Sequence, residues 1–401
     1  MRIPVFLNRD DYLQNPIMRR FLKEHDLDFV ENRADYINAI EEFANQNSQN
    51  ESETIEWLLK VVKEGSKDFC YRKIHGISDW HKNPALLDAK IREKFPNCPM
   101  QNILNYRSTG DMEMIEYYII TNDLNEAVKI EFTFSGLFLY GENGEFGDTT
   151  VFPIFVEVYL NEGFVVSRAK AKSTLYLYTP NNTFLITSNK IDTMDMAIRI
   201  VDDVIDLFEF ETDRNPKVIK NDNSKMLYNL YNKFSYTPED VVEKVDEQND
   251  VINGFVDEIF TRLNLSVRNR EKAILDAKIF VEKFISINGN NEDLFKNGRD
   301  AYLIKVSADD EIDLTRIDTT SDKTVPLPCT EAFFDSKKSV LKSGTCKKLH
   351  LIFKRVNDTY LKSNPLVVQM GTHKNYGYVK TMQYAEEADI KNVLQAIFEN
   401  Y

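Results

Sequence analysis

The chain has 401 residues and a mass of 46.7 kDa, more than a single hydrophobic core usually organises, so two or three domains are expected. Hydrophobic residues make up 42% and charged residues 28% of the chain, a composition that excludes a disordered or collagen-like protein. Lys and Arg number 50 against 64 Asp and Glu, and the resulting net charge of −14 excludes a histone-like polycation.

The compartment can be inferred from cysteine use and from the length of apolar segments. The N-terminal residues MRIPVFLNRDDYL lack the apolar core of a secretory signal, and no run approaches the ~18 apolar residues that span a bilayer. Cysteine occurs only 4 times, too rarely for a disulfide scaffold. We therefore expect a cytoplasmic protein with reduced thiols and no membrane partner.

Residues 1–109 are predicted to form an N-terminal helical region. Apolar residues recur every three or four positions over three segments, Asp10–Glu24, Arg33–Asn47 and Glu53–Glu64. Pro84 is expected to open a further helix that runs to Phe95.

Residues 110–192 change to a period of two and are predicted to form an antiparallel β-meander. Short alternating segments are separated by turn sequences such as TNDLNE and PNNT, which indicates five or six strands. The series Gly141, Gly144 and Gly147 lies in GENGEFGD between two of these segments. It favours a hairpin turn over a phosphate-binding loop.

Residues 193–298 return to helical spacing and are predicted to form a helical middle region. Asp192 or Thr193 is expected to cap its first helix, which should end before Pro216. Ser224 is expected to begin the next helix.

Residues 299–401 alternate again and are predicted to form a β-rich C-terminal region with a basic face. An amphipathic helix over Glu386–Asn400 closes the chain. Helices and strands are segregated along the sequence rather than strictly alternating, and this order predicts the α+β class.

An acidic motif in the helical middle is the first candidate for chemistry. Asp202, Asp203 and Asp206 spell DDxxD, the pattern with which isoprenyl-transferring enzymes hold Mg²⁺ and pyrophosphate. A later helix carries a second acidic run, so two carboxylate clusters could face each other across a metal site. The same aspartates also fall on one stripe of an otherwise apolar helix, and a solvated helix face explains them without a metal.

Cys70, His75, His81 and Cys98 form the other candidate metal site, because this is where two cysteines and two histidines cluster in the sequence. Four such ligands suit tetrahedral Zn²⁺, but their spacing lacks the closely spaced cysteine pair of typical zinc sites. Isolated cysteines are commonly small buried side chains. We therefore expect no metal and no cofactor.

The charge layout of the C-terminal region is the most informative feature. From Lys337 to Lys380 there are ten basic residues and one acid, Asp358, whereas Glu239–Glu258 holds eight acids and one lysine. A local excess of this size favours contact with a polyanion, and nearby tyrosines can stack on bases. The residues expected to contact nucleic acid are Lys347, Lys348, Lys354, Arg355, Lys374, Tyr376, Tyr378 and Lys380.

A second basic element is predicted in the meander. Arg168, Lys170 and Lys172 alternate with small residues, so on one strand they share a face. The small-residue face suits close packing of a helix, which would leave the basic face exposed. These three residues complete the expected nucleic-acid-binding set.

Together these patterns predict an intracellular nucleic-acid-binding protein that works in a larger assembly. Two other functions stay open: a metal-dependent phosphotransfer or hydrolytic enzyme that uses the acidic helices, and a scaffold that self-associates through opposed acidic and basic regions. The partner would then be nucleic acid, a second copy of the chain or another protein. The basic residues could also be a solvated face, or could dock on the protein's own acidic helices.

Overall fold

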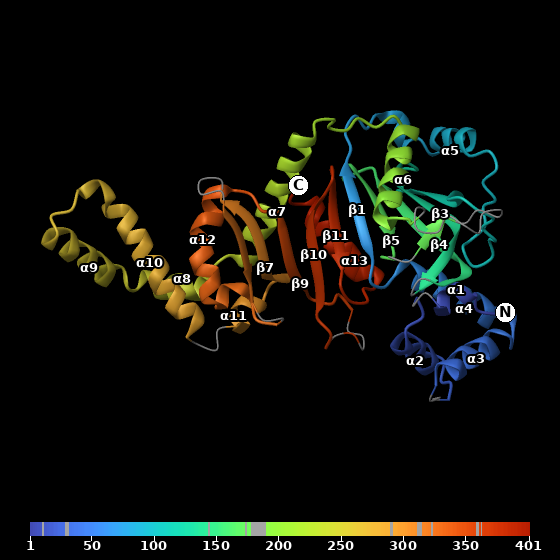
Figure 1. Ribbon diagram of the computed structural model, residues 1–401, viewed down its shortest axis with the longest axis horizontal. Coiled ribbons are helices and arrows are strands. Elements are labelled where there is room, and N and C mark those ends of the chain that lie inside the picture. Colours follow the sequence, from blue (N-terminus) through green and yellow to red (C-terminus); the bar gives the residue numbers. More distant parts are fainter. Residues whose placement is uncertain are drawn as a thin grey trace. The chain divides into compact units, whose positions relative to one another are not determined.

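The computed structural model describes residues 1–9, 12–28, 32–142, 145–172, 175–177, 190–288, 292–310, 315–321, 324–357, 361 and 363–401 (Figure 1). The chain divides into two compact units. Unit 1 comprises Met1–Arg214 and Gln383–Glu387, and unit 2 comprises Asn215–Met382 and Ala388–Tyr401. Helices and antiparallel strands are both abundant, and the fold belongs to the α+β class, as predicted.

The N-terminal helices of unit 1 occupy the three predicted segments, but two of them begin elsewhere, at Asn15 rather than Asp10 and at Ser48 rather than Glu53. Asn32 and Asn47 cap two of them, because their side chains accept hydrogen bonds from the backbone N–H groups of Asp35 and Asn50. The helices of this segment are α1 (Val5–Arg9), α2 (Asn15–Glu24), α3 (Arg33–Ala44), α4 (Ser48–Lys63), the 3₁₀ turn η1 (Asp79–Lys82) and α5 (Pro84–Lys94).

The sheet of unit 1 runs in the order β2-β3-β4-β5-β1, with β6 paired to β3, and its described pairs are antiparallel. Its strands are β1 (Asp68–Lys73), β2 (Glu113–Thr121), β3 (Ala127–Glu142), β4 (Glu145–Tyr159), β5 (Phe164–Ala169) and β6 (Leu175–Leu177). The predicted meander is confirmed in β2 to β5, and Gly141 lies in the β3–β4 hairpin. Gly144 lies outside the described residues. Strand β1 was not predicted, because three successive buried residues conceal its alternation.

Helix α6 (Thr193–Leu207) packs on this sheet against β1 and β5. Asp192 caps it as predicted, through hydrogen bonds from the N–H groups of Met194 and Asp195. The predicted end before Pro216 is wrong, because Glu209 takes a left-handed φ of 55° and the helix stops at Leu207.

Unit 2 begins with a helix inside residues 193–298, which the sequence predicted as one helical region. Asn215 caps α7 (Pro216–Ser235), since proline fits the first helical turn, and the helix passes through Ser224 without a break. The predicted helix start at Ser224 is therefore wrong. The other helices of unit 2 are α8 (Glu239–Asp246), α9 (Asn249–Arg262), η2 (Val267–Asn269), α10 (Arg270–Ile287), α11 (Glu292–Lys296), η3 (Leu327–Cys329), α12 (Glu331–Ser343) and the closing helix α13 (Glu387–Phe398), whose first residue belongs to unit 1.

The sheet of unit 2 runs in the order β11-β10-β9-β7-β8 and is antiparallel. Its strands are β7 (Ala301–Asp310), β8 (Thr315–Thr320), β9 (Lys348–Phe353), β10 (Leu366–His373) and β11 (Tyr376–Thr381). The alternating segments predicted in this region are confirmed as these strands.

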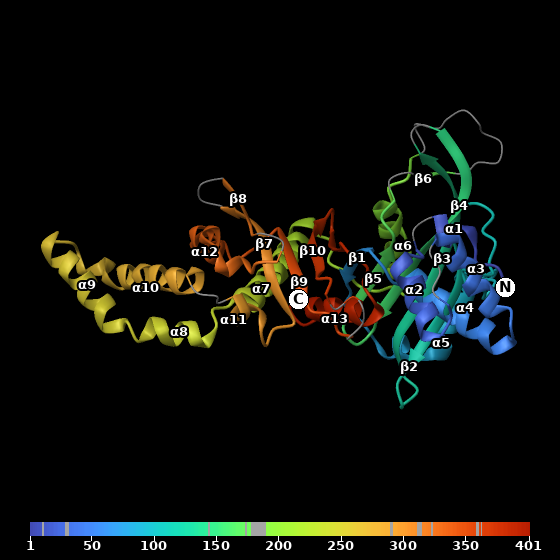
Figure 2. The ribbon, with the colours of Figure 1, turned by 90° about the horizontal axis from the view of Figure 1, so that it is seen from below.

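The two faces of the unit 2 sheet differ in what they carry. Leu349, Leu351 and Phe353 point to one face and are buried, and the Phe353 ring lies 5.8 Å from that of Phe234 on α7. Helix α13 lies beside α7, as the hydrogen bond from Asn229 to the Asn400 carbonyl shows, and Figure 2 shows both helices near the C-terminus. The opposite face carries the alternate residues of the same strands; on β9, Lys348 and His350 are half-buried and Ile352 is buried.

Candidate nucleic-acid interface

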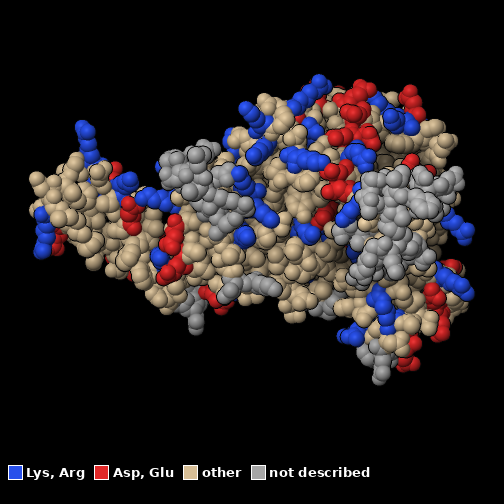
Figure 3. All heavy atoms as spheres, viewed as in Figure 1, with Lys and Arg blue, Asp and Glu red and all other residues tan. Residues whose placement is uncertain are grey.

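The half-buried face of the unit 2 sheet carries two rows of polar residues. Strand register aligns Lys380 with Gln369, Gln369 with His350, and His350 with Lys305. The neighbouring row runs across the same strands through Tyr378, Gly371, Lys348 and Ser307, of which Gly371 and Ser307 are buried. Because paired strands lie about 4.8 Å apart, the first row spans roughly 14 Å from β7 to β11. In Figure 3, Lys and Arg side chains gather around the area of β7, β9 and β10.

His350 lies at the centre of this basic sheet face, which we define as Lys305, Lys348, His350, Tyr378 and Lys380. Its pKa is lowered to about 4, first by burial and then by Lys348 and Lys305 on either side. The imidazole is therefore neutral at pH 7. Its Nε2 atom is buried and has no hydrogen-bond partner among the described residues. A buried polar atom without a partner is energetically costly.

The lysines of this face contrast with Lys337 and Lys338 of the same unit, which pair with carboxylates. Neither Lys305 nor Lys348 forms an ion pair with a residue that the structure describes, although both contribute to the low pKa of His350. Like charges held this close repel each other, so an anion placed between them would be attracted. Lys305 was missed in the sequence because it lies outside the dense basic stretch. The alternation of residues in the predicted strand YLIKV was the pattern that could have placed Lys305 on this face.

Three other predicted lysines lie at the ends of these strands and are exposed. Lys347 precedes β9, and Lys374 occupies the β10–β11 turn with a left-handed φ of 52°, so antiparallel pairing brings both to the same end of the sheet. Lys354 follows β9 at the opposite end, where its N–H donates to the Asp300 carbonyl. These lysines extend the basic surface beyond the two rows.

Two predicted contacts of the C-terminal region are wrong. Arg355 is buried in an ion pair with Asp389 of α13, with Nη1 2.8 Å from the carboxylate oxygen and both side chains at most 4% exposed. Tyr376 is only 5% exposed, so its ring cannot stack on a base, whereas Tyr378 remains half-buried on the open face. Burial that depends on residues distant in the sequence cannot be predicted from the spacing of neighbouring residues.

Part of the basic excess is neutralised inside unit 2. Lys337 and Lys338 lie on α12 and pair with Glu282 and Asp276 of α10, with nitrogen–oxygen distances of 2.7 and 2.9 Å. These two lysines are therefore neutralised within unit 2 by α10, which lies outside the acidic stretch Glu239–Glu258.

The prediction that the basic strand of unit 1 exposes its charged residues is wrong. Strand β5 ends at Ala169 and lies between β4 and β1, and all its residues are buried. Arg168 is only 1% exposed; its Nη2 is 3.0 Å from Glu157 and its Nη1 is 2.5 Å from Glu387. Beyond the strand, Lys170 places its Nζ 4.7 Å from the centre of the Tyr12 ring, and Lys172 is half-buried.

The acidic motif follows the solvated-face interpretation. Asp203 and Asp206 are exposed on α6, opposite the buried residues of that helix, and Asp202 lies 3.4 Å from Nη1 of Arg72. Among the residues that the structure describes, no group of three or more His, Cys, Asp or Glu side chains could hold a metal ion.

The four candidate zinc ligands have other contacts. The Cys70 thiol lies 2.8 Å from the Ser167 hydroxyl, and burial raises its pKa to about 12. Nε2 of the buried His81 lies 2.9 Å from the Phe208 carbonyl, and His75 lies 3.6 Å from Asp213. Cys98 lines a separate cavity.

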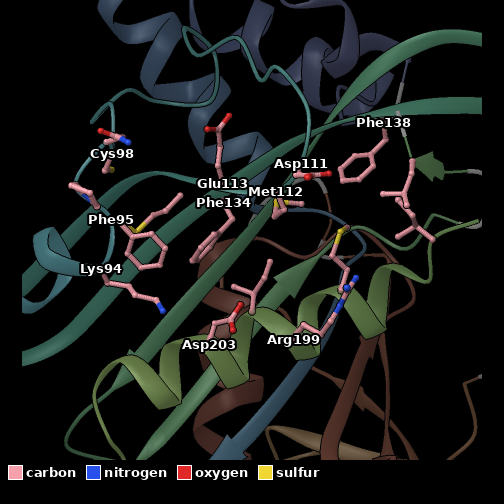
Figure 4. Close-up of a pocket in the computed structure, with 17 residues that line it drawn as sticks. Lys94, Phe95, Cys98, Asp111, Met112, Glu113, Phe134, Phe138, Arg199 and Asp203 are labelled. Atoms are coloured by element: carbon pink, nitrogen blue, oxygen red, sulfur yellow. The ribbon is translucent and has the colours of Figure 1, made fainter. Parts of the chain in front are cut away.

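That cavity, of about 820 Å³, lies in unit 1 between the end of α5, β2, β3 and α6. Figure 4 shows Lys94 and Asp203 at one side and Cys98 at another, with Phe134 between them. Burial raises the pKa of Asp203, an effect that Lys94 opposes, and burial also raises the pKa of Cys98. A raised thiol pKa disfavours the thiolate that nucleophilic catalysis requires.

Comparison with known proteins gives no match to this chain. No protein family matches its sequence, and no curated protein shows significant similarity to it. Of the helices that the structure describes, none is both long enough and apolar enough to cross a membrane.

Proposed function

We propose that this chain is a cytoplasmic nucleic-acid-binding protein that holds phosphates on the basic sheet face of unit 2. The observation that carries the proposal is the cross-strand arrangement of Lys305, Lys348 and Lys380 around the neutral His350. Lysines bind phosphates as point charges and need no special geometry, which suits sequence-independent binding.

A tyrosine beside the lysines favours a single strand over a duplex. The row of about 14 Å is long enough to contact a few consecutive phosphates. Tyr378 lies in the row next to the lysines, where its ring could stack on an unpaired base. A five-stranded sheet with one face covered by helices and the other polar is a rigid platform for such contacts.

The proposal also changes the set of contact residues. Arg168, Arg355 and Tyr376 leave it, because their side chains are buried. Lys305 and His350 enter it. Lys347, Lys354 and Lys374 remain as peripheral contacts at the strand ends.

The test is a salt titration of binding. Fluorescence anisotropy with a labelled oligonucleotide of about 20 nucleotides, as single-stranded DNA, single-stranded RNA and duplex, measures log K against log salt. In the triple variant Lys305→Ala, Lys348→Ala and Lys380→Ala, three lost phosphate contacts reduce the slope on single strands by about 2. Affinity at low salt should fall at least tenfold.

A matched control removes the same charge from another surface of unit 2. Lys217, Lys220 and Lys225 are exposed on α7, which covers the other face of the sheet. Changing these three to alanine should leave the slope unchanged. Equal losses in both triple variants, or no binding by the wild type at low salt, would disprove the proposal.

A further inference from the structure

A helical arm of unit 2, residues 239–287, exposes an unusual amount of apolar surface. It consists of α8, α9 and α10, and α9 and α10 form a hairpin around the 3₁₀ turn η2 (Figures 1 and 2). Only Ser286 of α10 is fully buried. Nine large apolar side chains of the arm are between 42% and 77% exposed: Val242, Val251, Phe255, Leu263, Leu265, Val267, Leu275, Phe280 and Phe284.

The apolar residues follow helical spacing rather than a random scatter. Val251 and Phe255 lie four residues apart on α9, and Phe280 and Phe284 lie four apart on α10 with ring centres 4.8 Å apart. Residues at this spacing share one side of a helix. Ile252 and Val256, next to the α9 pair, are buried within the unit. The apolar side of α9 is therefore wider than the part that packs within unit 2, and the remainder is exposed.

The exposed area of the arm matches what a stable interface requires. Summed over all sides of the arm, the nine side chains present on the order of 800 Å², about what each partner contributes to a standard protein–protein interface. Monomers rarely leave apolar patches of more than a few hundred Å² in water. In Figure 3 the arm, at the left, shows more uncharged than charged surface.

Charge is distributed unevenly along the arm. Its tip, residues 262–272, has four basic residues and one acid, and Arg262 and Arg270 among them pair with Glu258 and Asp257. Its base, residues 239–250, has six acids and one lysine, and Asp246 among them pairs with Lys278. Arg268 and Lys272 at the tip form no ion pair with a described residue, and neither do Glu243 and Glu247 at the base. The 18 residues of α10 separate the two ends by about 27 Å.

We propose that the arm packs antiparallel against the arm of a second copy of this chain, forming a symmetric dimer. A two-fold axis brings each basic tip to the acidic base of the other copy and places the apolar sides of α9 and α10 between them. The same surface then serves both partners, as a two-fold interface requires. This self-complementary charge pattern selects a second copy over an unrelated partner.

The first test is the oligomeric state of the full chain by sedimentation velocity, at about 1–100 µM, a range that covers interfaces of moderate affinity. The wild type should sediment as a dimer. Phe280→Ser with Phe284→Ser should raise the dissociation constant roughly 100-fold or more, because aromatic residues at an interface centre dominate binding. The matched control is Leu124→Ser, which removes a 79% exposed leucine from the β2–β3 turn of unit 1 and should leave the dimer intact.

The second test concerns the charges. Arg268→Glu with Lys272→Glu should weaken the dimer about tenfold through like-charge contacts, and so should Glu243→Lys with Glu247→Lys. The quadruple variant restores opposite charges and should recover the wild-type dissociation constant.

Three results would overturn the proposal: a monomeric wild type at the highest concentration, a serine variant that still dimerises like the wild type, or a quadruple variant weaker than both pairs. A monomer that binds anionic lipid vesicles or an oligonucleotide through the arm would likewise replace the second copy with that partner. Circular dichroism melting of each variant verifies that the exposed substitutions leave the fold unchanged.

Discussion

Basic strand residues have opposite electrostatic environments in the two sheets of this protein. In unit 1, Arg168 of β5 is enclosed between Glu157 and Glu387. In unit 2, Lys348 of β9 lies on a half-buried face without an ion pair to any residue that the structure describes, beside Lys305 and His350. Both residues stand in short alternating segments of the sequence. The comparison shows that the side chains packed around a basic strand residue, rather than the residue itself, decide whether a strand contributes charge to the surface.

The electrostatics of the two faces show the same contrast. Burial by itself would raise the pKa of Glu157, but Arg168 and Lys129 lower it to about 2, so the carboxylate stays charged within a paired network. His350 is neutral instead, because burial and two neighbouring cations all disfavour its protonated form. Opposite charges hold the network of unit 1 together, and like charges leave the face of unit 2 ready for an anion.

The largest expected effect comes from breaking the pair in unit 1. Glu157→Ala leaves Arg168 buried with less compensation and should reduce the free energy of unfolding of unit 1 by about 3–5 kcal/mol. Urea denaturation followed by tryptophan fluorescence measures this, because Trp57 and Trp80 both lie in unit 1. Lys348→Ala, the matched change in unit 2, should shift the free energy of unfolding by less than ~0.5 kcal/mol.

A rescue variant sharpens this result. Glu157→Leu with Arg168→Met replaces the buried pair by apolar side chains of similar volume and should recover most of the lost stability. If Glu157→Ala instead unfolds at the wild-type urea midpoint, Arg168 is not held by a buried ion pair.

The next effect concerns Tyr378. Tyr378→Ala should weaken binding of single strands by roughly 1–2 kcal/mol, since one stacked base is lost, while duplex affinity should change less than about twofold. Anisotropy titrations with both probes measure the difference. Tyr228→Ala is the matched control, because Tyr228 is a half-buried tyrosine of α7, where its ring lies 6.2 Å from that of Tyr231. If affinity for duplex and for single strands falls equally, Tyr378 does not stack on an unpaired base.

The smallest effect is the pH dependence that His350 gives to stability. Its pKa is about 4 in the folded chain and about 6.5 in an unfolded one, so the folded state binds fewer protons. Its contribution to stability is complete above about pH 6.5 and declines as the pH falls toward 4. His350→Gln should therefore make unfolding less dependent on pH between these values. Denaturation curves at several pH values measure this.

A titration of the histidine itself completes this comparison. NMR should show the pKa of His350 rising in Lys305→Ala with Lys348→Ala, because two of the causes of the shift are removed while burial remains. An unchanged pKa would mean that burial alone discharges the ring.

The sequence by itself determined the fold class and most of the elements, because these depend on local patterns. A period of two predicted β2 to β5 and the strands of unit 2, a period of 3.6 predicted the N-terminal helices and α13, and Asp192 predicted the cap of α6. Such patterns involve residues a few positions apart, and the backbone geometry of a helix or strand determines which of these residues share a face.

Only the tertiary structure decided which charged residues reach the surface. Arg168 pairs with a carboxylate 219 positions later in the chain, and Arg355 with one 34 positions later. Lys305 joins Lys348 and His350 through strand pairing that no local pattern announces. A charge is neutralised or left open by the side chains that folding places beside it, and the Coulomb energy depends on distance in space rather than on separation along the chain.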